Sequence, residues 1–482
     1  MRESRLALPI TAAIMACVAG SAFLVTQSAG AAFVWVVGLY LAGITFFFPR
    51  IGLGLLLLMM LFSPEVIVGA AGSREVTVRG DDLIIVLVAM GWLARMARRK
   101  EGAILRWSRP AAPILVMSGI LIISALSNVL LGNTEFASAV FYTGKRVEYF
   151  LVFFMVTSIF RDWDTARWML YLFLAGCLVV SVIGIYQFMT VQTPAQYGGV
   201  TSVFGIGEAN TLGGFTLLVI AVSFALATRE SHPWLKIGLI SLLVFSILCL
   251  TFSYSRGAYV ALPFAVLPVL FFDRSRASWK QFGWMASTVL FLGTVILLGG
   301  VFLSKGFAAR VFEPVGRQLS SIWSVFTEGP QADSSMGARW NAWGNALQYF
   351  SRHPILGMGP GSRPMGYYDS HWFRELAETG LAGLLTFIWI QISAFRLCLE
   401  ESREEDSPVQ GLALGFMGAQ VALWVHAFTA SNFYTIRTTE PFFFMLGLVA
   451  VGHFARREGE NEAAEEETEE RAVESELTHG LE

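Results

Sequence analysis

Long apolar runs separated by short polar segments dominate this sequence. Fourteen runs approach the ~20 residues that a helix needs to cross a bilayer. They are residues 9–26, 31–48, 51–68, 82–97, 110–127, 143–160, 168–189, 211–228, 235–251, 258–272, 282–303, 376–397, 409–428 and 441–455. Three of them (51–68, 82–97 and 258–272) are short enough to be partial or re-entrant, which gives twelve spans as the alternative. The pattern predicts an all-α fold, a polytopic transmembrane bundle of 12–14 spans.

The longest polar stretch, Ser304 to Glu375, interrupts this pattern near the C-terminal end. It is rich in Arg, Trp, His and Gly, the residue types that water-soluble chemistry would use. We therefore predict four parts of the chain. They are an N-terminal transmembrane bundle (1–303), one large helical loop (304–375), C-terminal transmembrane helices (376–455) and an acidic tail (456–482).

Composition supports a membrane protein, with 55% hydrophobic and 15% charged residues and a mean hydropathy of +0.59. The formal charge of -2 hides a tail that has eleven Glu and one Arg from Glu458 onward. Because this tail is acidic and lacks aromatic residues, we expect it to be disordered and cytoplasmic. No nucleic-acid partner is expected. The cysteines have no metal-ligand spacing, so neither a disulfide nor a zinc site is predicted: Cys17, Cys177, Cys249 and Cys398.

Clusters of Lys and Arg in short loops indicate the cytoplasmic side. The segment Arg95–Arg109 holds six basic residues and one Glu. Alternation from this segment places both termini inside and places the 304–375 loop outside. The first apolar run is interpreted as a signal anchor, and a cleaved signal peptide is the alternative.

Lys and Arg are normally concentrated on the cytoplasmic side, so basic residues at the outer ends of spans need an explanation. Arg256 lies in a break of small and hydroxyl residues between two apolar runs, at a depth where an unpaired charge is costly. With Lys145, Arg146 and Arg437 it could line a positive outer cavity that suits a lipid-linked anion.

Structural ion pairs are the alternative at three of these positions. Lys145 and Arg146 lie close to Glu148 in the sequence, and Arg437 lies close to Glu440. For Arg256 a functional partner is the favoured interpretation.

The loop itself contains an amphipathic pattern that opens at Arg339 and ends before Pro354, with Trp, Leu and Phe at helical spacing. Three glycines follow at Gly357, Gly359 and Gly361, and they permit unusual dihedral angles and a close approach to a ligand.

His371 opens the next helix pattern and is a candidate for acid–base chemistry. Ser370 before it is a candidate N-cap, and the Glu378–Gly380 tripeptide could mark a break in the same helix.

Three segments together resemble the O-antigen ligase/polymerase family of bacterial membrane glycosyltransferases. They are TFSYSRGAYVAL around Arg256, ARWNAWGNALQYFSRHPILGMGPG, and the His-bearing helix that runs into ETGLAGLL. The resemblance implies a bundle like those of the lipid-dependent (GT-C-like) glycosyltransferases. It also implies that Arg256 and Arg339 match the family's essential arginines and that His371 matches its loop histidine. The family often has Asn after that histidine, where this chain has Trp372.

The implied reaction transfers a glycan from undecaprenyl diphosphate to an acceptor hydroxyl at the periplasmic face of the inner membrane. Negative charge develops on the leaving diphosphate and must be neutralised. No outward Asp-x-Asp or His/carboxylate cluster offers a metal site, so we predict metal-independent, inverting transfer without a cofactor. Arg256 and Arg339 would hold the diphosphate, assisted by Lys145, Arg146, Arg437 and the three glycines.

His371 would act on the acceptor hydroxyl, with Asp369 and Glu378 as reserves. The expected partners are the lipid-linked donor, an acceptor and membrane lipids. A ligase, which uses lipid A core as acceptor, is favoured, and a polymerase, which uses a repeat unit, is the alternative.

Two other classes are less favoured. A polysaccharide transporter would place its site at the midplane between repeated halves, and no half-to-half repeat is evident. An acyltransferase would need a histidine deep in a span. The candidate is His426, which is better explained by bonds to neighbouring helix groups.

Overall fold

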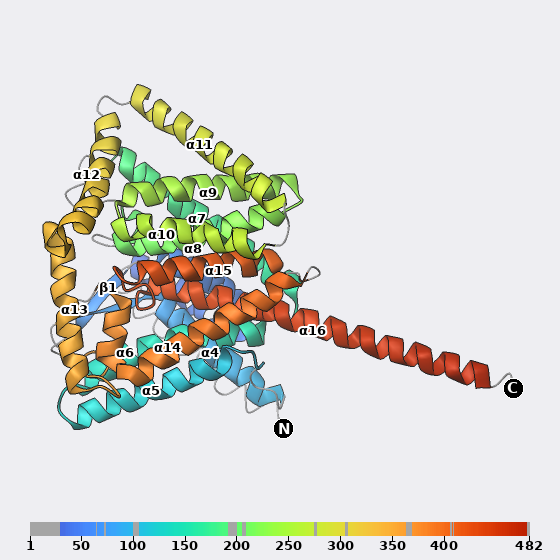
Figure 1. The fold of residues 1–482 in the computed structure, drawn as a ribbon. Helices are drawn as coiled ribbons and strands as arrows, with labels where there is room; N and C mark the ends of the chain where they lie inside the picture. Colours follow the sequence, from blue (N-terminus) through green and yellow to red (C-terminus); the bar gives the residue numbers. More distant parts are fainter. Residues whose placement is uncertain are drawn as a thin grey trace.

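A bundle of roughly antiparallel helices makes up most of the protein (Figure 1). The computed structural model describes residues 29–63, 65–71, 74–99, 106–190, 200–204, 209–273, 277–303, 307–362, 369–404, 407 and 409–479. The bundle helices are α2 (Ala29–Phe47), α3 (Pro49–Phe62), α4 (Gly80–Arg99), α5 (Ala111–Leu130), α6 (Phe136–Ile159), α7 (Trp163–Thr190), α8 (Ala209–Arg229), α9 (Pro233–Ser253), α10 (Arg256–Phe272), α11 (Ala277–Leu303), α14 (His371–Arg403), α15 (Gln410–His426) and α16 (Ile436–His479).

These helices confirm the all-α polytopic membrane fold. Each of them overlaps one of the predicted apolar runs, and the run at 9–26 lies outside the described residues. Six are long and apolar enough to cross a membrane by length and composition: α5, α7, α8, α9, α14 and the first part of α16. The total of 12–14 spans stays a prediction.

A β-hairpin lies between α3 and α4, in a fold for which the sequence predicted only helices. Strands β1 (Glu65–Ala71) and β2 (Arg74–Arg79) pair antiparallel, with Glu65 opposite Arg79 and an irregularity between Ile67 and Gly69. The hairpin ends directly at the start of α4, so it fixes where that helix begins.

The centre of the bundle is formed by α8, which is buried almost along its whole length. Helices α9, α10 and α15 pack around it. The sequence of α15, GLALGFMGAQVAL, is rich in Gly and Ala, which allow close approach between helices where lipid gives little hydrophobic drive. The helices around α8 thus form the frame that positions the start of α10 and the end of α15.

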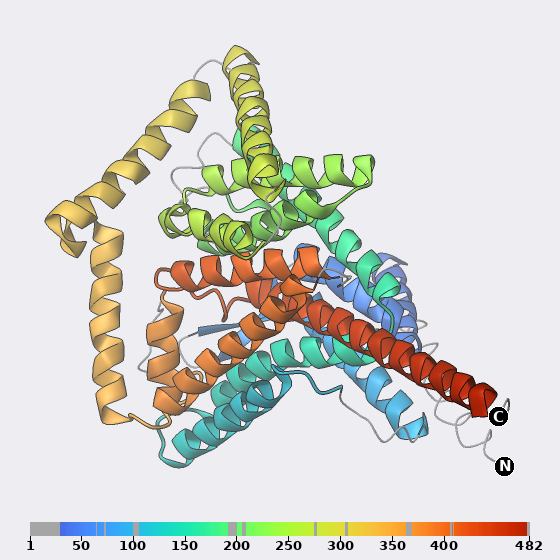
Figure 2. The ribbon, with the colours of Figure 1, turned by 45° about the vertical axis from the view of Figure 1, so that its right-hand side comes forward.

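Two amphipathic helices, α12 (Phe307–Glu328) and α13 (Ser334–Arg352), lie across one end of the bundle. Figure 2 shows them standing beside the helix ends, joined by the short 3-10 turn η3 (Pro330–Ala332). The helix predicted from Arg339 onward is present, but it begins earlier, at Ser334, and it ends at Arg352, two residues before Pro354. This pair forms the wall of the site described below.

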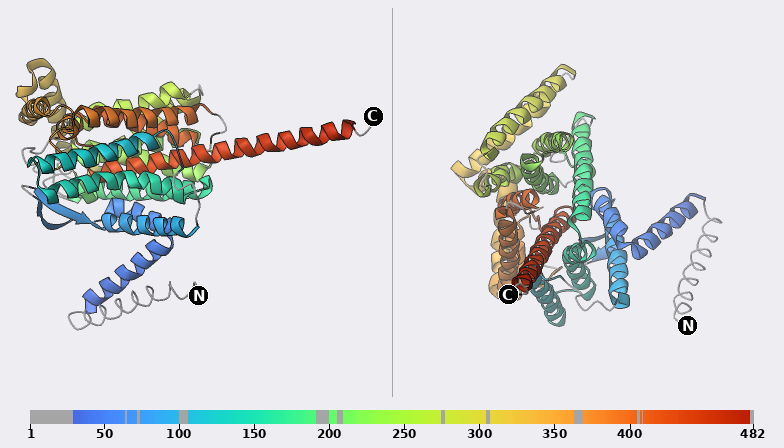
Figure 3. Two further views of the ribbon diagram at one scale, coloured as in Figure 1. Left: turned by 90° about the horizontal axis from the view of Figure 1, so that it is seen from below. Right: turned by 90° about the vertical axis from the view of Figure 1, so that its right-hand side faces the viewer.

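The acidic tail differs from the disordered segment expected from composition. It continues α16 as a helix to His479, which projects beyond the bundle (Figure 3). Ala, Glu and Arg have high helix propensity, and extending an existing helix avoids the cost of nucleation.

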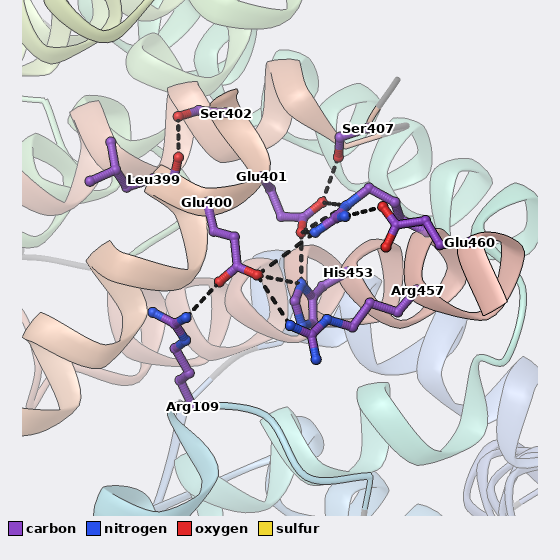
Figure 4. Close-up of polar contacts among 10 residues, drawn as sticks. Arg109, Leu399, Glu400, Glu401, Ser402, Ser407, His453, Arg457 and Glu460 are labelled. Carbon is purple, nitrogen blue, oxygen red and sulfur yellow. Dashed lines mark hydrogen bonds and ion pairs between the residues drawn. The ribbon is translucent and has the colours of Figure 1, made fainter. Parts of the chain in front are cut away.

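An ion cluster joins α14, α16 and the segment before α5 (Figure 4). Glu401 is fully buried and accepts hydrogen bonds from His453 Nδ1 at 2.7 Å, Arg456 Nη2 at 2.8 Å and Ser407 Oγ at 2.6 Å. The neighbouring Glu400 pairs with Arg109 at 2.9 Å. A buried carboxylate is tolerated here because its partners supply charge and hydrogen bonds.

We expect Glu401→Gln to lower the thermal stability of the detergent-solubilised protein markedly. The change leaves Arg456 and His453 without their common anion, and breaking a buried pair costs about 3 kcal/mol or more. Glu404→Gln, at an exposed position one turn away, is the control and should melt like the wild type. Equal melting temperatures for both variants would contradict a stabilising role of the cluster.

Candidate functional site

A cavity of about 600 Å³ opens where the ends of α8, α10 and α15 meet α12 and α13. Arg256 and Arg339, which are distant in the sequence, both line it. The other polar groups of the lining include Asn210, Gln318, Ser321 and Ser335. Among the described lining residues there is no Asp, Glu, His or Cys, so the charge of this cavity comes from the two arginines.

Arg256 is the first residue of α10. The preceding helix ends at Ser253, Tyr254 adopts a left-handed conformation with φ 54°, and Ser255 bonds Asn210 Oδ1 at 2.9 Å. The break predicted from the Ser-Arg-Gly sequence is therefore confirmed, and it directs Arg256 toward α12 and α13.

Asp333 holds this guanidinium. One carboxylate oxygen lies 2.6 Å from Arg256 Nη1 and 2.8 Å from Ser321 Oγ, and the other caps α13 by accepting from the Met336 amide at 2.9 Å. Because the same carboxylate caps the helix and pairs with the arginine, the start of α13 and the position of Arg256 are fixed together. Sequence analysis did not include Asp333 in the site, because the helix pattern was predicted to open only at Arg339.

Burial acts to raise the pKa of the Asp333 carboxyl, but hydrogen bonds from Arg256, the Met336 amide and Ser321 lower it to about 2. A lowered pKa means that the stabilisation is fully present above the carboxyl's ordinary value and is lost as the pH falls through about 2. The pair with Arg256 therefore persists throughout the physiological range.

We expect Asp333→Asn to reduce activity roughly tenfold with little change in melting temperature. Asn caps helices about as well as Asp, but it lacks the charge that orients Arg256. Asp333→Ala loses the cap as well and should cost about 1 kcal/mol of stability in addition. Transfer rates and melting curves of the two variants separate these effects, and an Asn variant with full activity would contradict the orienting role.

Arg339, on α13, is held in a similar way. Its guanidinium lies 2.7 Å from Asp369 and donates to Ser335 Oγ at 2.7 Å, while its buried Nε has no hydrogen-bond partner among the described residues. The stacking of Trp343 on Phe373, with ring centroids 4.9 Å apart, packs α13 against the first turns of α14. Each arginine of the cavity is thus fixed by one carboxylate and one serine.

His371 lies behind this cavity. Its ring is fully buried between Phe387 and Phe433 and is not part of the cavity lining. Its backbone amide donates to Ala427 and Ala430, in the α15–α16 connection whose other side contributes to the cavity wall. Neither ring nitrogen has a hydrogen-bond partner among the described residues.

The start of α14 differs in detail from the predicted cap. Ser370 occupies the N-cap position, but its hydroxyl donates to the Ala427 carbonyl at 3.2 Å and makes no capping bond. The helix break predicted within Glu378–Gly380 is confirmed, because Gly380 has the non-helical dihedral angles φ 64° and ψ -157°.

A buried ion network surrounds His371. Arg146, from α6, lies 2.5 Å from Glu375 and 3.8 Å from Glu378, and Arg374 donates to Glu378 at 2.9 Å. Glu375 Oε2 is 3.9 Å from His371 Nε2. Arg146 is therefore beside His371 rather than beside Arg256, and the partner predicted for it, Glu148, is replaced by two acids of α14.

Lys145 and Arg437 lie outside the cavity lining. Lys145 pairs with Asp82 and lies 3.7 Å from Glu148, which confirms the ion pair considered for it. Arg437 donates to the carbonyls of Leu61 at 2.8 Å and Ser63 at 3.1 Å. A role of either residue in binding substrate stays a prediction.

The three glycines of the loop have the left-handed φ values that only glycine adopts easily: 64° at Gly357, 83° at Gly359 and 77° at Gly361. A Cβ at Gly357 would lie 2.4 Å from the backbone of Glu378, one at Gly359 2.9 Å from Asn128, and one at Gly361 2.4 Å from Tyr142. The close approach they permit is therefore to α5, α6 and the broken part of α14, and binding of a ligand by these glycines stays a prediction.

The contacts of His426 agree with the prediction that it bonds to neighbouring helix groups. Its Nδ1 lies 3.0 Å from Asn432 Oδ1 and its Nε2 lies 3.4 Å from Ser255 Oγ. These bonds fix α15 and its following connection against the start of α10. The cysteines Cys177, Cys249 and Cys398 are free and buried, while Cys17 lies outside the described residues.

Fold and site together define a polytopic membrane protein with two fixed arginines in a cavity at one end of its bundle. Residues 241–388, from α9 to α14, match the model of a family described as O-antigen ligase. This match confirms, for the matched segment, the resemblance to the O-antigen ligase/polymerase family. Arg256, Arg339 and His371 all lie in the matched segment. No curated protein matches the chain.

Proposed function

We propose that this protein is a membrane glycosyltransferase that moves a glycan from a lipid diphosphate to an acceptor hydroxyl. The main support is the meeting of Arg256 and Arg339 in one cavity within the segment that matches the O-antigen ligase family. Arginine binds phosphate through a planar fork of donors and keeps its charge at every physiological pH. Two such groups fit the two phosphates of the donor.

In this proposal the arginines also stabilise the transition state. Cleavage of the bond between the sugar and the diphosphate leaves negative charge on the phosphate oxygens, and fixed cations lower the barrier most when they are already in place. Asp333 and Asp369 supply this pre-organisation. Because the described lining offers no carboxylate or imidazole ligand, we propose that the transfer needs no metal ion or other cofactor.

His371 is the proposed base for the acceptor hydroxyl. Burying an imidazole without hydrogen bonds costs free energy of folding. A protein can tolerate this cost where a bound substrate supplies the missing hydrogen bonds to the ring nitrogens. The ring is buried and lies outside the cavity lining, so in this proposal the acceptor reaches it only when the neighbouring 427–430 connection moves. Direct attack of the activated hydroxyl on the anomeric carbon would invert its configuration.

The donor and acceptor are proposed from the family. We propose undecaprenyl diphosphate-linked O-antigen as donor and lipid A core as acceptor, which makes the protein an O-antigen ligase of the bacterial inner membrane. The basic segment Arg95–Arg109 supports cytoplasmic termini and a cavity that faces the periplasm.

Purified protein in proteoliposomes, supplied with the undecaprenyl-linked glycan, tests this proposal. We expect a product only when lipid A core is added. Chain growth from the donor alone would overturn the ligase assignment in favour of a polymerase. Absence of transfer with either acceptor, from protein that melts cooperatively, would overturn the assignment as a glycosyltransferase.

A further inference from the structure

A second cluster of charged residues lies between α4, α6 and α16, apart from the arginine cavity. Asp81 and Asp82 belong to the first turn of α4, and Glu440 belongs to the start of α16. One carboxylate oxygen of each of these three residues lies within 4.8 Å of those of the other two. Glu148 of α6 lies near these three residues, because its carboxylate is close to Lys145, which also pairs with Asp82.

Among the side chains that the structure describes, the basic residues of this region do not balance the acidic ones. Arg79 Nε lies 3.0 Å from Asp81, and Lys145 pairs with Asp82. Arg437 also lies nearby and donates to the carbonyls at the end of α3. Four described carboxylates therefore face three described basic groups, and these seven groups have an excess of negative charge when every one is ionised.

Glu440 gives the second, independent indication of a ligand. Its side chain is fully buried, and neither of its carboxylate oxygens has a hydrogen-bond partner among the described residues. Asp81 Oδ2 and Glu148 Oε1 are also buried without such a partner. A buried carboxylate in this state costs several kcal/mol unless a cation or a proton compensates it.

We propose that Asp81, Asp82 and Glu440 bind one divalent cation, with Ca²⁺ as the best fit. Ca²⁺ takes carboxylate oxygens at about 2.3–2.6 Å, so two ligands on opposite sides of the ion are roughly 4.6–5.2 Å apart. The three oxygens all lie within 4.8 Å of one another, so they can contact one such ion. Mg²⁺ gives up its water reluctantly and is seldom held by protein carboxylates alone, which favours Ca²⁺.

The ion would join the first turns of α4 and α16, which are far apart in the sequence. The side chains of Asp82 and Lys145 retain 14% and 12% exposure, so the ion can enter the site from this edge. When Asp82 binds the ion, Lys145 can keep Glu148 as its acidic partner. The role of the site is to stabilise the helix ends. It does not rest on the proposed transfer reaction.

Thermal unfolding of the full-length protein in detergent tests the site. After chelation and removal of the chelator, CaCl₂ or MgCl₂ is added to the wild type, to Glu440→Gln and to Glu328→Gln, which alters an exposed carboxylate of α12. We expect about 1 mM Ca²⁺ to raise the melting temperature of the wild type and of Glu328→Gln by at least ~3 °C. Glu440→Gln should not respond. The control is needed because any weak binding of Ca²⁺ by the acidic tail is the same in every variant.

Binding of ⁴⁵Ca²⁺ gives the second measurement, in which Glu440→Gln should lose one tight site per chain. If that variant does not fold, Asp81→Asn takes its place with the same expected outcome. A wild type that responds to neither cation, or a Glu440→Gln variant that responds like the wild type, would overturn the proposal. A response to Mg²⁺ alone would overturn the assignment to Ca²⁺.

Discussion

Replacing Arg256 or Arg339 by alanine should lower the rate of glycan transfer by about 10³-fold, which corresponds to roughly 4 kcal/mol of transition-state stabilisation. Both side chains line the cavity, and the described lining offers no other cation to take over the charge. The measurement is the initial rate of transfer of a labelled glycan from undecaprenyl diphosphate in proteoliposomes.

Lysine at the same positions refines this prediction. It keeps the charge but loses the fork that contacts two phosphate oxygens, so Arg256→Lys should be intermediate, about 10- to 100-fold slower than the wild type. Arg317→Ala is the matched control, because it removes an exposed arginine of α12 that does not line the cavity. If Arg256→Ala and Arg317→Ala retained equal activity, the arginines would not hold the donor.

Replacing His371 by alanine should lower the turnover rate by 10²- to 10⁴-fold, the usual contribution of a general base, and should leave the KM for the donor almost unchanged. The reason for the second part is geometric, since the ring lies outside the lining of the cavity in which we propose that the diphosphate binds. Steady-state kinetics with varied donor concentration measure both quantities.

The exposed His232, at the start of α9, provides the control for this variant. His232→Ala should retain full activity. A raised KM for the donor in His371→Ala would place the histidine in donor binding, and unchanged turnover in a stably folded variant would contradict its role as the base.

Local sequence signals predicted the helices around the site well. The amphipathic spacing from Arg339 and the following Pro354 predicted α13, and the ETG tripeptide predicted the break at Gly380. The Ser-Arg-Gly break predicted the position of Arg256 at a helix start. In each case the deciding residues lie within a few positions of one another.

Contacts between distant segments could not be predicted in the same way. The Arg146–Glu375 pair joins residues 229 positions apart, whereas the partner considered from the sequence was Glu148, which is close in the chain. The packing of His371 away from the cavity likewise depends on Phe433, in a connection that has no regular pattern of its own. This long-range packing decides which side chains at a helix start face the cavity. The spacing of residues along the chain does not.

The affinity of the protein for undecaprenyl diphosphate without a glycan tests the central claim most directly. It can be measured by displacement of a labelled analogue from the wild type and from the Arg256→Gln/Arg339→Gln double variant. If the two arginines hold the diphosphate, the double variant should bind it at least 100-fold more weakly, a loss of about 3 kcal/mol. Its affinity for undecaprenyl monophosphate should change much less. Equal affinity of the wild type and a stably folded double variant for the diphosphate would contradict the account.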